Sequence, residues 1–168
     1  MTVELTRMIE LGRIGPAGLD VRVDANATEC AALAQRMNLP SVLSLRCDFH
    51  LSLDGEAVDT RGHLVARVVQ TCILSLEEFE ATVEERFKVR FVPSGTESDD
   101  EDPDSIDELP YEGNAIDLGE AAAEQLGLAL DPYPRMPGAT LPEELTQEHT
   151  GAFAALAALR RSTGSQDD

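Results

Sequence analysis

Residues 41–54 read SVLSLRCDFHLSLD and decide the fold, because apolar and polar residues alternate along them. The apolar residues of this stretch occupy the odd positions Leu43, Leu45, Cys47, Phe49, Leu51 and Leu53. A period of two is typical of a β-strand that turns one face toward a core. The chain is predicted to reverse at Asp54-Gly55, a dipeptide that favours a two-residue hairpin.

Two more strands are predicted to continue this sheet as an antiparallel meander. With the turn at Asp54-Gly55, Leu51 faces Val58, and the second strand then presents its apolar side chains on the same side as the first. Residues 79–92 repeat the alternation, with only Glu85 out of pattern, and their apolar set is Ala81, Val83, Phe87, Val89 and Phe91. Such a one-sided sheet needs a cover from the rest of the chain.

The flanking segments supply further elements. Residues 2–11 and 19–23 also alternate, around a Gly- and Pro-rich turn, and are predicted to form an N-terminal hairpin. Asn26 is predicted to cap a helix reciprocally with Glu29, and Asp117 to cap a second helix that stops at Gly127. The fold class is therefore α+β: an antiparallel sheet of about five strands, open or partly closed into a barrel, covered by two or three helices.

Charge is distributed unevenly in this single domain of residues 1–168. The formal net charge is −19, yet residues 93–131 alone hold thirteen Asp and Glu and no Lys or Arg. The acidic part, residues 95–114, is expected to be a mobile loop, and residues 162–168 a disordered tail. A third helix is expected to start at Thr140. The acids lack EF-hand spacing, so no metal ion or cofactor is expected.

The N-terminal residues and the cysteines indicate the cellular compartment in which the protein is expected. No run of eighteen apolar residues occurs, and the first residues carry Glu4, Arg7 and Glu10 where a signal peptide would be apolar, so a cytoplasmic location without a membrane contact is expected. Cys30, Cys47 and Cys72 each fall on an apolar face, which favours buried thiols.

Motifs for catalysis are absent from the sequence. It has no Gly-rich phosphate loop, nucleophile elbow or metalloprotease helix. In the predicted register His50 lies opposite Asp59 and His63 opposite Arg46, so the two histidines are two pairs apart. A small metal-binding or hydrolytic enzyme is therefore the alternative hypothesis, and a non-enzymatic protein the favoured one.

Basic residues gather on the polar faces of the second and third predicted strands. These candidates for RNA contact are Arg61, Arg67, Arg86, Lys88 and Arg90. A stripe of this kind can meet phosphates, but Asp59, Glu80 and Glu84 share the surface and no aromatic residue is interleaved to stack on bases. A solvated face of mixed charge is the competing interpretation.

Three short motifs, in order, resemble the YceD family, the large ribosomal RNA subunit accumulation proteins. Residues 72–79, CILSLEEF, are similar to its Cys-x-x-Cys-x-x-x-Phe signature, residues 116–131 to its Ile-Asp-Leu helix motif, and residues 151–159 to its Asn-Pro-Phe-x-x-Leu tail. The positions carried over are Cys72, Phe79, Asp117, Glu124 and Phe153. Ser75 replaces the second cysteine, so neither a zinc site nor a local disulfide is expected there.

This resemblance implies a bacterial cytoplasmic factor needed for accumulation or processing of 23S ribosomal RNA in large-subunit biogenesis, and not an enzyme. Two modes of action fit the residues. The basic stripe contacts the RNA or its precursor directly, or the acidic segment binds a basic ribosomal or processing protein and affects the RNA indirectly. The second mode is favoured because the acidic block is the most extreme feature of the sequence.

Overall fold

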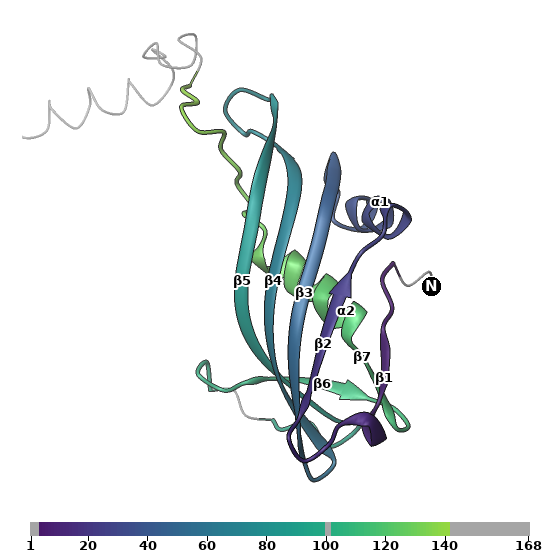
Figure 1. Cartoon of the computed structure of the whole chain (residues 1–168). Coiled ribbons are helices and arrows are strands. Elements are labelled where there is room, and N and C mark those ends of the chain that lie inside the picture. Colours follow the sequence, from purple (N-terminus) through teal and green to yellow (C-terminus); the bar gives the residue numbers. More distant parts are fainter. Residues whose placement is uncertain (1–3, 100–101, 142–168) are drawn as a thin grey trace, which may run out of the picture.

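Five strands form one sheet in the computed structural model, which describes residues 4–99 and 102–141. The strand order is β2 (Leu19–Asp24), β3 (Ser41–Asp54), β4 (Ala57–Thr71), β5 (Glu78–Pro93) and β6 (Asp107–Tyr111) (Figure 1). The α+β class and the meander of β3, β4 and β5 are confirmed. The prediction of a wholly antiparallel sheet is wrong, because β6 runs parallel to β5. Among the described strands, β2 and β6 are the two ends of the sheet, and no closed barrel forms.

The predicted N-terminal hairpin is also wrong. The first strand, β1, spans only Met8–Glu10 and pairs with β7 (Ala115–Asp117), while β2 pairs with β3. A three-residue 3-10 helix, Leu11–Arg13, separates β1 from β2. Alternation predicts which face of a strand is buried, but it does not predict which strand lies beside it. β2 pairs over its whole length with β3 and not with the three-residue strand β1.

The β3–β4 turn differs from the predicted one by two residues of register. Asp54 pairs with Ala57, so the turn residues are Gly55 and Glu56, and Gly55 alone has a positive φ, of 65°. A hairpin turn of this kind needs glycine only at its first central position. Leu51 consequently faces Thr60, not Val58. Because the shift is an even number of residues, both apolar faces stay on the side that was predicted.

Two leucines of β3 leave the predicted core face. A bulge between Val42 and Ser44 reverses the alternation, so Val42 is buried and Leu43 is 44% exposed. Leu53 lies beside the turn and is 41% exposed. The remaining predicted residues of this face, from Leu45 to Leu51, are buried.

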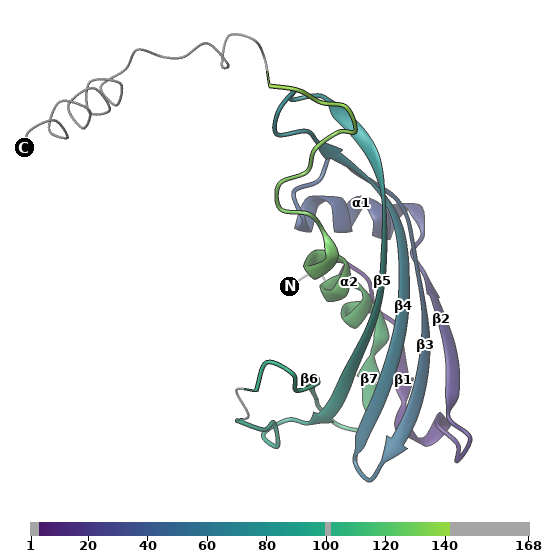
Figure 2. The same cartoon turned by 90° about the vertical axis from the view of Figure 1, so that its left-hand side faces the viewer.

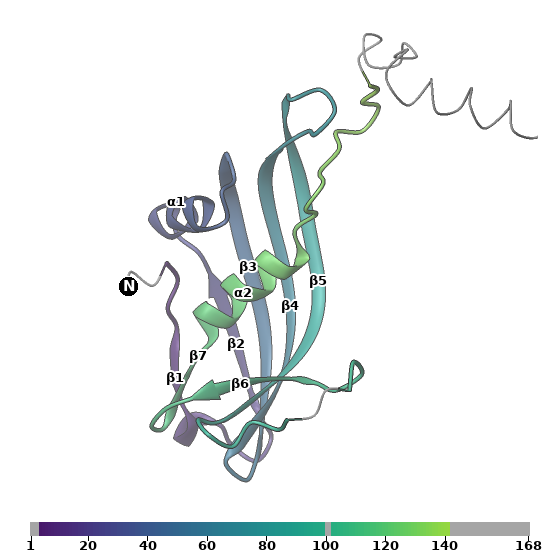
Figure 3. The ribbon, with the colours of Figure 1, turned by 180° about the vertical axis from the view of Figure 1, so that it is seen from behind.

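One face of the sheet, called the inner face here, is covered by the two described helices and by the β1–β7 pair. Helix α1 (Ala27–Arg36) lies over one end of β3, and α2 (Leu118–Ala129) crosses the sheet obliquely (Figures 2 and 3). The side of α2 that faces the sheet is buried at Leu118, Ala121, Ala122, Gln125 and Leu126. The opposite, outer face of β2–β5 carries no other element of the described chain (Figure 2).

Both predicted helix starts are confirmed. Asn26 Oδ1 accepts from the Glu29 backbone N–H at 2.9 Å, and Glu29 Oε2 accepts from the Asn26 N–H at 2.8 Å. The stop at Gly127 is wrong: Gly127 stays helical, and α2 ends at Ala129, where the Leu130 N–H donates to the Leu126 carbonyl before the backbone becomes extended. Three predicted segments extend beyond Leu141 and so lie outside the described residues: the helix expected to start at Thr140, residues 151–161 with the family-like motif, and the tail at 162–168.

Part of the predicted mobile loop is a strand. Residues 107–111 form β6 within the 95–114 range, and Tyr111 Oη donates to the Glu56 carbonyl oxygen at 2.5 Å. Leu109 and Tyr111 supply apolar contacts that the preceding acids lack, and they pack against the core. The prediction of a loop is therefore wrong for β6, and mobility of the acids before it stays a prediction.

A glycine in β4 sets how tightly the inner face packs. Gly62 pairs with Phe49 on one side and Phe87 on the other, and the two rings meet edge to face with centroids 5.9 Å apart. A Cβ atom at Gly62 would lie 2.1 Å from Phe87 Cζ, so the ring of Phe87 occupies the space of the missing side chain.

Gly62→Ala is therefore expected to destabilise the protein by about 1–3 kcal/mol, because the Phe87 ring must move out of its contact with Phe49. Chemical denaturation measures the change. Gly12→Ala is the matched control, since nothing lies within 4 Å of a Cβ there. Equal stabilities of the two variants would contradict this packing.

Candidate functional site

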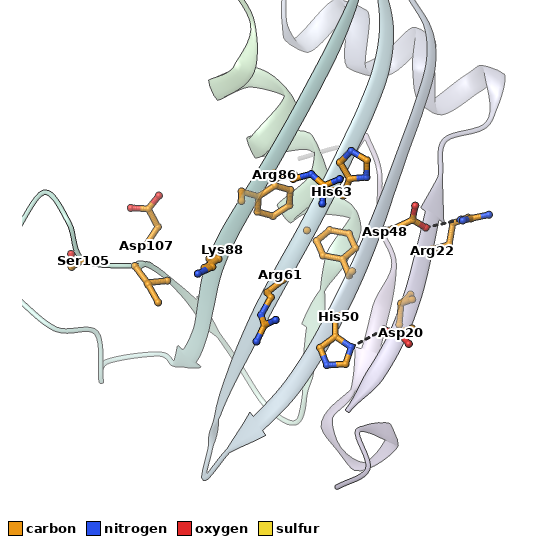
Figure 4. Close-up of a pocket in the computed structure, with 15 residues that line it drawn as sticks. Asp20, Arg22, Asp48, His50, Arg61, His63, Arg86, Lys88, Ser105 and Asp107 are labelled. Carbon is orange, nitrogen blue, oxygen red and sulfur yellow. Dashed lines mark hydrogen bonds and ion pairs between the residues drawn. The ribbon is translucent and has the colours of Figure 1, made fainter. Parts of the chain in front are cut away.

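The centre of the outer face is hollowed. An open hollow of about 910 Å³ extends across β2, β3, β4 and β5 (Figure 4). Its walls are the side chains of Asp20, Arg22, Asp48, His50, Arg61, His63, Arg86 and Lys88. Val21, Phe49, Gly62 and Phe87 also line the hollow. They alternate along the strands with the residues of the walls and form its floor. Ser105, Ile106 and Asp107, where the chain enters β6, complete the lining beside β5.

Most cations of the outer face are matched by carboxylates on neighbouring strands. Arg90 contacts both Asp54, at 2.8 Å, and Asp59, at 2.5 Å, and Arg67 pairs with Glu80. Two further pairs cross from β2 to β3: Arg22 with Asp48 at 2.6 Å and Arg46 with Asp24 at 3.0 Å. Two members of the predicted stripe, Arg67 and Arg90, therefore have their charge compensated within the protein.

Three cations of the predicted stripe remain unpaired within the described chain. Arg61, Arg86 and Lys88 are exposed, and no ion pair or side-chain hydrogen bond joins them to residues 4–99 or 102–141. Arg61 lies directly opposite Lys88, and Arg86 is two residues from Lys88 on the same face of β5. These three residues are called the cationic patch below. Their proximity concentrates positive charge at one place in the hollow (Figure 4).

The two histidines are closer together than the sequence predicted. His50 lies opposite Arg61, and His63 lies opposite Asp48, so the histidines are diagonal neighbours on the outer face. The predicted partners, Asp59 and Arg46, were wrong because of the same two-residue shift of register. His50 Nδ1 is 2.7 Å from Asp20 Oδ1, and His63 Nε2 is 2.7 Å from Glu84 Oε1. No group of three or more His, Cys, Asp or Glu side chains able to hold a metal ion occurs in the described part of the chain.

Cys72 directly follows β4 and is fully buried. Cys47 is also fully buried, and Cys30 is buried with 5% of its surface exposed. The Ser75 backbone N–H donates to Cys72 Sγ at 3.5 Å. Hydrogen bonds from the Ser75 side chain and backbone lower the pKa of Cys72 to about 7. Ser75 thus supports the thiolate form of Cys72 but supplies no second sulfur ligand.

Asp117 joins the N-terminal strand to α2. Its Oδ1 accepts from the backbone N–H groups of Arg7 at 2.8 Å, Gly119 at 2.9 Å and Glu120 at 3.2 Å. A Cβ at Gly119 would lie 2.7 Å from the Leu5 carbonyl oxygen, so the close approach of the two segments requires glycine. Asp117 therefore has a structural role.

The other carried-over positions lie apart from the hollow. Phe79 is half-buried on β5. Glu124 lies on α2, where burial and then the neighbouring Glu120 raise the pKa of its carboxyl. Phe153 lies outside the described residues.

A family model described as large ribosomal RNA subunit accumulation protein YceD matches residues 60–160. The chain belongs to the YceD family. The matched range contains the cationic patch and all five carried-over positions, whereas β1–β3 and α1 precede it. No individual curated protein and no solved structure matches this YceD chain. None of the helices within residues 4–99 and 102–141 has the length and apolar character needed to cross a membrane.

Ser75→Ala is expected to raise the pKa of Cys72 from about 7 toward that of an ordinary thiol, because a hydrogen bond to the thiolate is lost. The pH dependence of the cysteine Cβ chemical shifts measures it. Burial raises the pKa of Cys47 to about 12 and also raises that of Cys30, so Cys72 is the thiol expected to titrate near neutrality. An unchanged neutral titration in the variant would contradict the role of Ser75.

Proposed function

We propose that this YceD protein is a non-enzymatic binding factor in the accumulation of large-subunit ribosomal RNA, and that it contacts RNA phosphates through the cationic patch. The family description supplies the biological role. The observation that carries the contact is that Arg61, Arg86 and Lys88 lie together without an ion pair in the described chain. Phosphate binding at these residues breaks no ion pair among the residues that the structure describes.

The chemistry of the patch suits phosphate groups. Arg61 and Arg86 offer planar guanidinium groups that donate two parallel hydrogen bonds to one phosphate, and Lys88 adds a compact charge. Of the acids around the patch, Asp20, Asp48, Asp59 and Glu84 already contact His50, Arg22, Arg90 and His63 respectively. Asp107 also lines the hollow and makes no ion pair within the described chain. Repulsion from more distant acids is screened within about 8–10 Å at ordinary ionic strength. The net charge of −19 is therefore compatible with a local phosphate contact.

The same surface favours contact with the backbone over reading of bases. The rings of Phe49 and Phe87 belong to the inner face, so they offer no stacking platform in the hollow. Three cations contacting three phosphates of a single strand predict a slope of about −2 for log affinity against log salt. We infer weak, salt-sensitive binding without strong sequence preference.

The open hollow supports binding better than catalysis. His50 and His63 each contact a carboxylate, but Ser105 is the hydroxyl residue in the lining and no hydrogen bond within the described chain links it to either histidine. A nucleophile within hydrogen-bonding reach of its base is what covalent hydrolysis requires. The enzyme hypothesis consequently has less support than the binding hypothesis.

The indirect mode keeps separate support from the acidic segment. Residues 93–131 contain thirteen acids and no Lys or Arg, a composition suited to a basic ribosomal or processing protein. This second mode is proposed alongside the RNA contact, because it uses residues outside the cationic patch.

Replacing Arg61, Arg86 and Lys88 together by glutamine is expected to abolish most retention of a single-stranded ribosomal RNA fragment in a filter-binding assay. The salt slope should fall from about −2 toward zero, since the phosphate contacts are lost. The matched control replaces Arg36, Arg46 and Arg67 by glutamine, which changes the net charge equally but removes cations that are paired with carboxylates and do not line the hollow.

The control variant should keep the wild-type slope. Equal losses in the two variants would mean that only overall charge matters, and absence of binding by the wild-type protein would refute direct contact. Melting temperatures of both variants verify that each is folded.

A further inference from the structure

Strand β5 has a long edge without a neighbour. β6 pairs only with residues 89–93, so residues 78–88 have β4 on one side and, among the strands of residues 4–99 and 102–141, no neighbour on the other. Within the described chain, no hydrogen bond from the backbone of residues 78–88 reaches a group outside the β4 ladder. Alternate N–H and C=O groups along this edge are therefore available to an added strand.

The apolar side of this edge is incompletely covered. Where β6 is present, Val89 and Phe91 are 1% and 4% exposed, but farther along β5 the inner-face residues Phe79, Ala81 and Val83 are only half-buried. A trough of about 450 Å³ lies here, between residues 79–84 and the segment 129–137 that follows α2.

The segment that forms the second side of the trough, residues 129–137, is held in place by hydrogen bonds. The segment after α2 climbs beside β5 toward the tip of the β4–β5 hairpin (Figure 3). The Ile73 N–H donates to the Pro134 carbonyl at 2.9 Å, and Gln70 Nε2 donates to the Asp131 carbonyl at 3.4 Å. The trough therefore has two sides, with the free backbone edge along one of them.

The charge at this edge selects the occupant. Residues 77–85 hold five glutamates and no Lys or Arg, and the cations Arg86 and Lys88 follow them. Glu80 and Glu84 already contact Arg67 and His63. Glu78 and Glu85 are exposed and make no ion pair within the described chain, and Glu85, opposite Leu64, places a charge on the otherwise apolar inner face. Inward-pointing charges of this kind discourage pairing with a second copy, which would bring like charges together, and RNA is repelled for the same reason.

We infer that the β5 edge at residues 78–85 binds a basic, extended segment of a partner protein as an added strand. The backbone of the partner pairs with β5, its apolar side chains at alternate positions enter the trough, and the intervening Lys or Arg side chains meet the glutamates. This site ends directly before Arg86 of the cationic patch and is separate from the acidic residues 97–108. It does not depend on the proposed RNA contact.

The probe is a synthetic peptide of alternating lysine and valine, titrated against the full chain without RNA. Its matched control is the same peptide with N-methyl groups on alternate backbone nitrogens, which keeps the charge but removes the edge hydrogen bonds. Methylation is expected to weaken binding by about tenfold or more. The unmodified peptide should protect amides in residues 78–85 from hydrogen exchange. Equal affinity of the two peptides, or absence of that protection, overturns the inference.

Protein variants locate the site. Glu78→Lys with Glu85→Lys should weaken peptide binding by about tenfold or more, whereas Asp99→Lys with Asp104→Lys, an equal change of charge in the acidic segment, should leave it within about twofold. The reverse result assigns the peptide to the acidic segment and overturns the inference, as does protection of residues 78–85 by self-association of the chain alone. The glutamine variant of the cationic patch should bind the peptide at least as tightly as the wild-type chain, because two cations beside the site are removed, whereas it should lose RNA; this separates the two tests.

Discussion

The structure depends on one constraint: β3, β4 and β5 must all turn their apolar residues to the same face. Because these apolar residues share one face, that side of the sheet is buried under α2 and the β1–β7 pair. On the same face, Phe87 fills the space over Gly62. The charged residues of the same strands are then forced onto the outer face by alternation. The hollow, its ion pairs and the cationic patch all follow from that separation.

The sequence predicted the faces of the strands better than the contacts across them. An even shift at the Gly55-Glu56 turn left each face unchanged, so the buried residues from Leu45 to Leu51 were predictable. The same shift changed every cross-strand partner, which is why the neighbours of His50 and His63 were wrong. The distinction between compensated Arg90 and uncompensated Arg61 depends on those partners and was beyond the sequence pattern.

Two other features needed three-dimensional contacts. The pairing of β1 with β7 joins residues more than one hundred positions apart, and local alternation has no information on such a partner. β6 lies in a stretch with too many acids to read as a strand, and its few apolar residues become effective only when β5 is beside them. By contrast, the caps at Asn26 and Asp117 are local interactions, and both were predictable.

Separation of charge on the molecule resolves the contrast between a very acidic chain and a family associated with ribosomal RNA. Ion pairing on the outer face uses most cations and leaves Arg61, Arg86 and Lys88 together, while the largest acidic block precedes β6. One protein can then offer phosphates and basic peptides different surfaces. In this account the sheet is a rigid support whose outer face and β5 edge are the surfaces available for binding.

The central claim is that the outer face of the sheet contacts RNA while the inner face stays sealed. Backbone amide NMR of the full chain, titrated with a single-stranded ribosomal RNA fragment, measures this most directly. The account predicts shifts around Arg61, Arg86 and Lys88, with the amides of α2 unchanged. Shifts confined to residues 97–108 or to α2, with none in the central part of β4 and β5, would contradict it.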